Sequence, residues 1–158
     1  EMKDVLTSVR VMTEEGEIME LPAEKLGLGY RTSIIPEKRY IVLGAVISLT
    51  EGKKEEIKAQ MDDLRQKRVS KQPLEYPSAG STFKRPEGYF AGKLIQDSGL
   101  KGFTVGGAQV SEKHSGFVIN KGNATAADVM ELIRQVTAKV KEDTGVTMEP
   151  EVKQIGEF

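Results

Sequence analysis

The sequence predicts an α+β fold, and three observations lead to this class. Two apolar, β-branched runs surround a turn near the start, a charged helical pattern follows, and strand and helix patterns then succeed each other. The expected order is a β-hairpin, a strand, a helix, a loop, two strands, a helix and a last strand. This order favours α+β over a repeating βαβ arrangement.

The first part of the chain has the pattern of a hairpin followed by a buried strand. Residues 5–11 and 18–21 are rich in β-branched and apolar side chains, and the turn-forming residues 14–16 separate them. Residues 23–26, between Pro22 and Gly27, predict a short helical turn, and residues 29–33 a loop. The continuous apolar run at 40–49 predicts a well-buried strand.

A change of composition near Glu51 marks the expected domain boundary. Residues 53–68 are highly charged, and their apolar residues recur at helical spacing, so we expect a helix with one packed face. The packed face would contain Ile57, Met61 and Leu64. The segment 71–86, rich in Pro, Gly and Ser, predicts a long loop.

The remaining residues predict alternating short elements. A short helix around residues 94–95 is followed by strands at 103–110 and 116–120, with Gly106–Gly107 as a bulge or turn. A capping box at residues 125–128 begins a helix that Gly145 ends, and its apolar face follows the 3.6-residue period. Alternation after residue 146 predicts a last strand with one polar face.

Composition excludes several classes of function. A length of 158 residues with 38% apolar content indicates a globular protein, and a net charge of −1 gives no field that would favour nucleic acid or an acidic membrane. No apolar run approaches the ~20 residues of a membrane-spanning helix. The chain has no cysteine and a single histidine, His114, so we expect no disulfide and no metal site, and a reducing compartment.

The segment at 78–86 has the composition of an anion-binding loop. Gly80 allows close approach of a ligand, and the Ser81 hydroxyl beside it can donate or accept a hydrogen bond. Lys84 and Arg85 suit a phosphate or carboxylate, and Pro86 ends the segment. We interpret this segment as a loop that holds an anionic substrate against a hydroxyl.

Four motifs in order resemble a known family. They are Gly-Tyr-Arg-Thr-Ser at 29–33, Lys-Gln-Pro at 71–73, Ala-Gly-Ser-Thr-Phe-Lys-Arg-Pro at 79–86 and Glu-Pro-Glu-Val at 149–152. Together they resemble the UDP-N-acetylenolpyruvoylglucosamine reductases, flavoenzymes of bacterial peptidoglycan precursor synthesis. The tight loop between residues 71 and 79 resembles the shorter subtype of this family.

The resemblance implies a domain organisation and an activity. Residues 1–50 correspond to the C-terminal part of the FAD-binding domain, and residues 51–158 to the substrate-binding domain with a returning C-terminal strand. The chain then resembles a C-terminal fragment without the N-terminal flavin-binding lobe. The intact enzyme would use FAD and NADPH to reduce a UDP-sugar enolpyruvyl ether in the bacterial cytoplasm, with no obligate protein partner. The resemblance assigns no cofactor-binding residue in this chain.

The resemblance also implies three catalytic residues. Ser81 falls on the proton donor of the family, and Arg31 on the arginine that holds the substrate carboxylate where negative charge develops. Glu151 falls on the active-site glutamate, whose protonated form would donate a hydrogen bond to the enolate-like species. Glu149 is a rival for this role, and only the register of the motif favours Glu151.

Five further residues are candidates for substrate binding. Lys71, Lys84 and Arg85 are expected to meet the UDP pyrophosphate, although a solvated basic edge explains the three cations equally well. Arg85 stands where many members of the family carry asparagine. Tyr30 would contact substrate or flavin, or pack in a core, and His114 would be a substrate contact.

Two other functions remain open at this point. One is a non-catalytic module that binds the UDP-sugar, and the other is a structural α+β domain without a ligand. Bound flavin would favour the oxidoreductase. A thermal shift with the UDP-sugar in a colourless preparation would favour the binding module.

Overall fold

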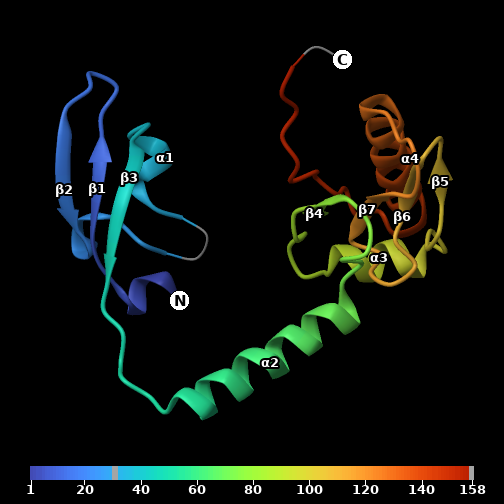
Figure 1. Ribbon diagram of the computed structural model, residues 1–158. Coiled ribbons are helices and arrows are strands. Elements are labelled where there is room, and N and C mark those ends of the chain that lie inside the picture. The colour runs from blue at the N-terminus through green and yellow to red at the C-terminus, as the bar shows by residue number, and fades with distance from the viewer. Residues whose placement is uncertain (30–31, 157–158) are drawn as a thin grey trace. The chain divides into compact units, whose positions relative to one another are not determined.

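The computed structural model describes residues 1–29 and 32–156, and the chain divides into two compact units. The first unit comprises residues 1–57 and the second begins at residue 58, so the division falls inside helix α2 (Lys54–Lys71). Both units combine helices with antiparallel sheet (Figure 1). The predicted α+β class is confirmed.

The first unit is built on a three-stranded antiparallel sheet. The predicted hairpin forms strands β1 (Leu6–Met12) and β2 (Ile18–Pro22), and β3 (Ile41–Ile47) pairs with the other edge of β1. The strand order is therefore β2-β1-β3 (Figure 1).

Three short helices accompany this sheet. They are η1 (Met2–Asp4), η2 (Ala23–Lys25), which is the predicted helical turn, and α1 (Ile34–Glu37), which the sequence analysis did not anticipate. Ser33 begins α1, and its hydroxyl accepts a hydrogen bond from the Ile35 N–H at 3.3 Å. The buried centre of this unit consists of Val9, Val11 and Leu26.

Strand β3 is exposed, so the prediction of a well-buried strand is wrong. Its side chains, including Ile41 and Ile47, are 54% and 50% exposed. The reason is that β3 is an edge strand, while the core of the unit forms around β1 and η2. Continuous apolar character correctly indicated a strand, but it did not indicate which neighbour covers the strand.

Helix α2 forms as expected but without the expected packed face. Ile57, Met61 and Leu64 are 46%, 65% and 57% exposed, and none of the residues of α2 is buried. The four large apolar side chains of this mostly polar helix, which include the exposed Val69, give no wide apolar stripe, and local pairs such as Lys67–Asp63 at 2.6 Å support it instead.

The second unit contains a four-stranded antiparallel sheet with the order β4-β7-β6-β5 (Figure 1). Its strands are β4 (Ser78–Ser81), β5 (Thr104–Val105), β6 (Ala108–Val110) and β7 (Phe117–Asn120). The two predicted strand regions after residue 100 are therefore present. β4 lies within the segment predicted as loop.

Two helices pack with this sheet. They are α3 (Ala91–Asp97) and α4 (Ala126–Thr144), and both were predicted. In the capping box of α4, Thr125 Oγ1 accepts from the Asp128 N–H at 3.1 Å, and Asp128 accepts from the Thr125 N–H at 2.8 Å. Gly145, with φ of 75°, ends the helix as expected. The predicted apolar face is buried through Leu132, Ile133, Val136 and Val140.

The Gly106–Gly107 pair forms the tight turn between β5 and β6. A Cβ atom at Gly106 would collide with the Asp128 carboxylate, and one at Gly107 would collide with the Gly122 carbonyl. Glycine is required here because the start of α4 packs onto the turn. The turn is thus filled by protein groups and does not form a phosphate cradle.

The predicted last strand is not formed. Residues 146–153 run as irregular backbone with one isolated bridge, Phe83 to Pro150. Two backbone hydrogen bonds of 2.8 Å flank the bridge, from Lys84 N–H to the Glu149 carbonyl and from Glu151 N–H to the Thr82 carbonyl. Pro150 has no N–H, which interrupts a longer ladder.

Within residues 1–29 and 32–156, none of the helices combines the length and apolar character that crossing a bilayer requires.

Candidate functional site

Ser81 lies at the end of β4, beside an irregularity of the strand. Ser78 and Ser81 pair with Ile119 and Phe117 of β7, and the register shifts between the two pairs. Gly80 lies in this shift with φ of 91°, a conformation that side chains other than glycine rarely adopt. Pairing with β7 turns the centre of the predicted loop into a short strand, and the irregularity determines where the Ser81 hydroxyl lies.

Thr82 fixes the backbone around Ser81. It is 2% exposed, its N–H donates to the Gly116 carbonyl at 2.8 Å, and its Oγ1 accepts from the Val118 N–H at 3.0 Å. Its carbonyl accepts from the Glu151 N–H at 2.8 Å. A single buried residue therefore connects β4, β7 and the C-terminal segment, and it holds Ser81 and Glu151 at neighbouring positions.

Ser81 and Glu151 line the same hollow, which has a volume of about 480 Å³. Seventy residues separate them in the chain, so the fold brings together two of the three residues that the sequence analysis expected to be catalytic. The described residues that line it are Ala79, Ser81, Glu151, Val152 and Lys153.

Lys153 is a lining residue that the sequence analysis missed. A signal was available, because the polar residues of the C-terminal segment alternate and Lys153 lies two positions after Glu151. Its ammonium group is suited to an anionic part of a bound molecule.

Lys84 and Glu149 form an ion pair beside this hollow. Lys84 Nζ lies 2.8 Å from a Glu149 carboxylate oxygen. The hydrogen bond from Lys84 lowers the pKa of Glu149. The same bond raises the pKa of Lys84, and the negative charge of Glu151 raises it further. The geometry thus distinguishes the rival glutamates, since Glu149 is engaged by Lys84 and Glu151 lines the hollow with Ser81.

Lys84 and Glu149 also border a second, smaller hollow of about 340 Å³. Arg85 is held here by its Nε, which donates to the Tyr89 carbonyl at 3.3 Å, and by stacking of its guanidinium 4.1 Å above the Phe90 ring. The remaining lining residues are Pro86, Glu87, Val146 and Thr147.

The other predicted substrate-binding residues lie apart from each other in the second unit. Lys71 is the exposed last residue of α2. His114 is exposed in the turn that leads to β7, and its Nδ1 accepts a hydrogen bond from the Gly116 N–H at 3.1 Å. A Cβ atom at Gly116 would lie 3.7 Å from Ser81 Oγ, so this turn borders the Ser81 hydroxyl.

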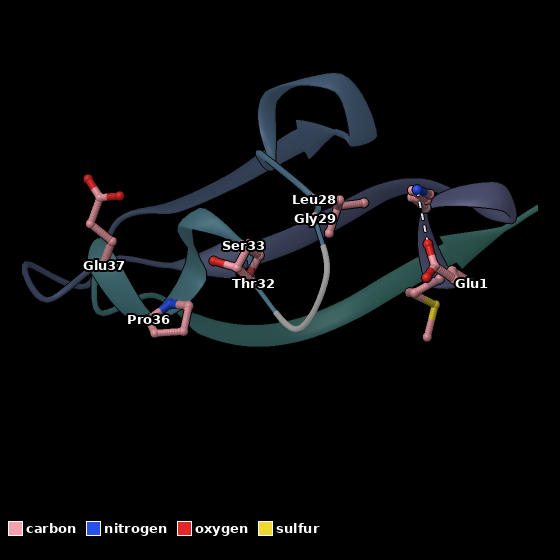
Figure 2. Close-up of a pocket in the computed structure, with 9 residues that line it drawn as sticks. Glu1, Leu28, Gly29, Thr32, Ser33, Pro36 and Glu37 are labelled. Carbon is pink, nitrogen blue, oxygen red and sulfur yellow. Dashed lines mark ion pairs between the residues drawn. The ribbon is translucent and has the colours of Figure 1, made fainter. Parts of the chain in front are cut away.

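Tyr30 and Arg31 lie outside the residues that the structure describes. The residues on either side of them are described, and a bridge joins Gly29 to Thr32, with the Gly29 N–H donating to the Thr32 carbonyl at 3.1 Å. A hollow of about 650 Å³ in the first unit adjoins this bridge. Figure 2 shows its lining, which includes Glu1, Leu28, Gly29, Thr32, Ser33, Pro36 and Glu37.

Within residues 1–29 and 32–156, no three His, Asp or Glu side chains gather closely enough to hold a metal ion. The described residues that line the hollow supply the hydroxyl of Ser81, the carboxyl group of Glu151 and the ammonium group of Lys153.

Residues 72–155 match the protein family described as UDP-N-acetylenolpyruvoylglucosamine reductase, C-terminal domain. The chain is 63% identical over its 158 residues to the UDP-N-acetylenolpyruvoylglucosamine reductase of Agathobacter rectalis, and it covers 50% of that protein. It is 60% identical over 157 residues to the reductase of Lachnoclostridium phytofermentans, of which it covers 51%. The chain spans about half the length of the curated relatives it matches.

A solved structure is also similar. The crystal structure of UDP-N-acetylenolpyruvylglucosamine reductase from Thermus caldophilus superimposes with a TM-score of 0.78 at 38% sequence identity. The alignment covers 96% of this chain and 53% of the Thermus chain. The likeness thus extends over nearly the whole of this sequence.

Proposed function

Because the chain belongs to the UDP-N-acetylenolpyruvoylglucosamine reductase family, we propose that it acts in reducing UDP-N-acetylglucosamine enolpyruvate to UDP-N-acetylmuramate. This reaction serves peptidoglycan precursor synthesis. The observation that carries the proposal is the meeting of Ser81 and Glu151 in one hollow. In the proposal, residues 1–50 are the end of the flavin-binding domain and residues 51–158 the substrate-binding domain.

The reaction adds a hydride to the vinyl carbon of the enolpyruvyl group and a proton to the adjacent carbon. FAD, reduced by NADPH, supplies the hydride when it is bound. The Gly106–Gly107 turn is filled by Asp128 and Gly122 and does not fit a flavin pyrophosphate, so we assign no flavin contact to it. The part proposed for this chain is to orient the substrate and deliver the proton.

Ser81 is the proposed proton donor. A serine hydroxyl is a weak acid in water, but the carbon of an enolate-like species is strongly basic, so proton transfer runs downhill once the geometry is correct. The hydrogen bonds of Thr82 support this role because they fix the backbone next to Ser81 before any substrate binds.

Glu151 and Arg31 are proposed to stabilise the charge that develops on the substrate carboxylate. The protonated form of Glu151 would donate a hydrogen bond to the developing acid enolate, and the Arg31 guanidinium would hold the same group. Lys153, which lines the hollow with Glu151, adds a further positive charge to this environment.

The UDP part of the substrate is proposed to contact the basic residues of the second unit. Lys84 and Arg85 border the smaller hollow, and Lys71 ends α2 on the chain segment that leads to β4. We also propose that His114 and Tyr30 contact the substrate. Lys84 can bind a phosphate only by sharing or leaving Glu149, so substrate binding should weaken that ion pair.

A second candidate follows from the share of the relatives that this chain covers. With 50% of the Agathobacter protein matched, these 158 residues by themselves are suited to binding the UDP-sugar without turnover. This candidate predicts a colourless protein whose thermal unfolding shifts upward with UDP-N-acetylglucosamine. Binding to the folded state alone raises stability by ~2.7 kcal/mol at 100 times the dissociation constant.

A hybrid enzyme tests the proposed activity. The 158 residues would replace the matching half of the Agathobacter reductase, and NADPH oxidation would be followed with the enolpyruvyl substrate. We expect turnover that falls ~10²- to 10⁴-fold in Ser81→Ala, the range for loss of a general acid. Ser70→Ala, which removes an exposed hydroxyl from α2, is the matched control and should leave the rate unchanged. A Ser81→Ala hybrid with the parent rate would exclude Ser81 as proton donor.

A further inference from the structure

The single histidine of the chain lies in a slot between two glycines. A Cβ atom at Gly92 of α3 would lie 3.4 Å from His114 Cε1, and one at Gly116 would lie 3.1 Å from the same atom. The ring also meets Phe117 edge to face, with 4.9 Å between the ring centres. The imidazole therefore occupies a defined position, although it is exposed on its other side.

The turn that carries His114 is held by its own hydrogen bonds. The hydroxyl of Ser111, which is 1% exposed, accepts from the N–H groups of Lys113 at 3.2 Å and His114 at 3.3 Å. The His114 carbonyl accepts from the Phe117 N–H at 3.0 Å. These bonds hold the backbone that carries the imidazole beside its slot.

The hydrogen bond from Gly116 assigns the proton of the imidazole. His114 Nδ1 lies 3.1 Å from the Gly116 nitrogen and accepts its N–H, so Nδ1 carries no proton. A neutral imidazole in this arrangement has its proton on Nε2. The Nε2–H group is thereby left as a donor for another partner.

The two peptide groups that flank the Gly116 Cα atom connect this histidine to the neighbourhood of Ser81. The Gly116 N–H donates to His114, and the Gly116 carbonyl accepts from the Thr82 N–H at 2.8 Å. The space that its missing Cβ leaves lies 3.7 Å from Ser81 Oγ. A change in the backbone dihedral angles of Gly116 would therefore shift the Thr82 backbone and change the room around the Ser81 hydroxyl.

We infer that His114 is a positioning residue for Ser81. Its Nδ1 holds the Gly116 N–H, and the Gly116 carbonyl, on the other side of the same Cα atom, holds the Thr82 N–H. The imidazole thereby fixes the conformation of Gly116 and keeps the space beside the Ser81 hydroxyl open. The catalytic consequence rests on the proposed function, because it takes Ser81 as the proton donor. The structural part, a histidine tautomer that holds the Gly116 and Thr82 amides, does not depend on that function.

The first test uses the whole 158-residue chain labelled with ¹⁵N histidine. Since His114 is the only histidine, one imidazole gives all the ring signals in a long-range ¹⁵N–¹H spectrum. For the neutral form of the ring we expect the signals of an unprotonated Nδ1 and a proton on Nε2, together with slow exchange of the Gly116 amide. A proton on Nδ1 in the neutral ring, or a freely exchanging Gly116 amide, would overturn the inference.

Two substitutions separate the acceptor from the ring. His114→Asn keeps an oxygen where Nδ1 lies, and His114→Phe keeps the ring and its contact with Phe117 but has no acceptor. In the hybrid enzyme we expect His114→Phe to lower kcat by about 10- to 100-fold, the effect of a small misplacement. His114→Asn should recover most of the loss in kcat, whereas a rise in KM from losing the proposed substrate contact of the imidazole should appear in both variants.

The opposite order, with Phe active and Asn inactive, would show that the ring only fills space and would overturn the inference. Failure of the proposed function is distinguishable, since the parent hybrid would then be inactive. In that case amide exchange at Gly116 and Thr82 in the 158-residue variants tests whether His114 holds these two amides. The His114→Asn variant should exchange like the parent, and the His114→Phe variant should exchange faster.

Discussion

Replacing Thr82 by valine should lower the stability of the second unit and weaken the hydrogen bonding that fixes the backbone next to Ser81. Valine has the shape of threonine but no hydroxyl, so the Val118 N–H, which donates to Thr82 Oγ1 at 3.0 Å, would lose its acceptor in a site that is 2% exposed. A buried donor left without a partner costs about 1–3 kcal/mol. The packing around the side chain would otherwise be preserved.

The expected size of the effect follows from the size of the unit. A domain of ~60–100 residues loses about 4–8 °C in Tm for each kcal/mol, so Thr82→Val should unfold roughly 4–24 °C below the parent. Circular dichroism during heating measures this shift. Native-state hydrogen exchange of the Val118 amide locates its cause.

Thr82→Ser is the matched control for this experiment. It keeps the acceptor oxygen and removes one methyl group, which costs about 1 kcal/mol. Exchange at Val118 should be fast in the valine variant and slow in the serine variant. A valine variant that unfolds at the parent temperature with a protected Val118 amide would refute the account of how Ser81 is held.

Three other predictions follow from the structure. Gly107→Ala should destabilise the second unit by about 1–3 kcal/mol, because the new Cβ atom would collide with the Gly122 carbonyl. Gly122→Ala is the control, because its Cβ atom would meet open space, and chemical denaturation compares the stability of the two variants. Removing the cap with Thr125→Ala should cost about 1 kcal/mol in the same assay, and no loss would argue against the capping box. Because Lys84 lowers the pKa of Glu149 below its ordinary 4.5, the ion pair contributes above that pH and is lost as pH falls through the lowered value. The protection factor of the Lys84 amide, which is the ratio of its intrinsic to its observed exchange rate at the same pH, should fall there. A protection factor that stays constant on acidification would contradict this last prediction.

Much of the fold could be predicted because it is determined locally. The capping box at Thr125, the C-terminal Gly145 and the turn at Gly106–Gly107 each require particular residues at particular positions, and the structure uses them as expected. The hairpin of β1 and β2 likewise depends on alternating side chains around a short turn. Such features involve residues that are close in sequence.

The errors concern packing and pairing between distant segments. The run that became β3 shows the composition of a covered strand, but its position at the edge of the sheet is a property of the whole unit. Residues 146–153 alternate like a strand, yet Pro150 and a partner that offers only one bridge prevent a ladder. The composition of the β4 segment predicts a loop, because its pairing with β7 depends on a strand about 40 residues away in the sequence.

The candidate site was accessible to sequence only through the family motifs. Nothing in the residues alone indicates that Ser81 and Glu151 share a hollow, since the contact depends on the backbone bonds of Thr82 and Lys84 to the C-terminal segment. The choice between Glu149 and Glu151 rested on motif register, and the ion pair with Lys84 now supports it. The role inferred for His114 required the geometry of Gly92 and Gly116.

The central claim is that side chains distant in sequence act on one substrate molecule. A crystal structure of the hybrid enzyme with bound UDP-N-acetylmuramate tests it most directly. We predict that Ser81 Oγ and a Glu151 carboxyl oxygen each lie within about 3.5 Å of the lactyl group, the distance of reacting or hydrogen-bonded atoms. A lactyl group bound elsewhere, with water alone in the hollow between Ser81 and Glu151, would contradict the account.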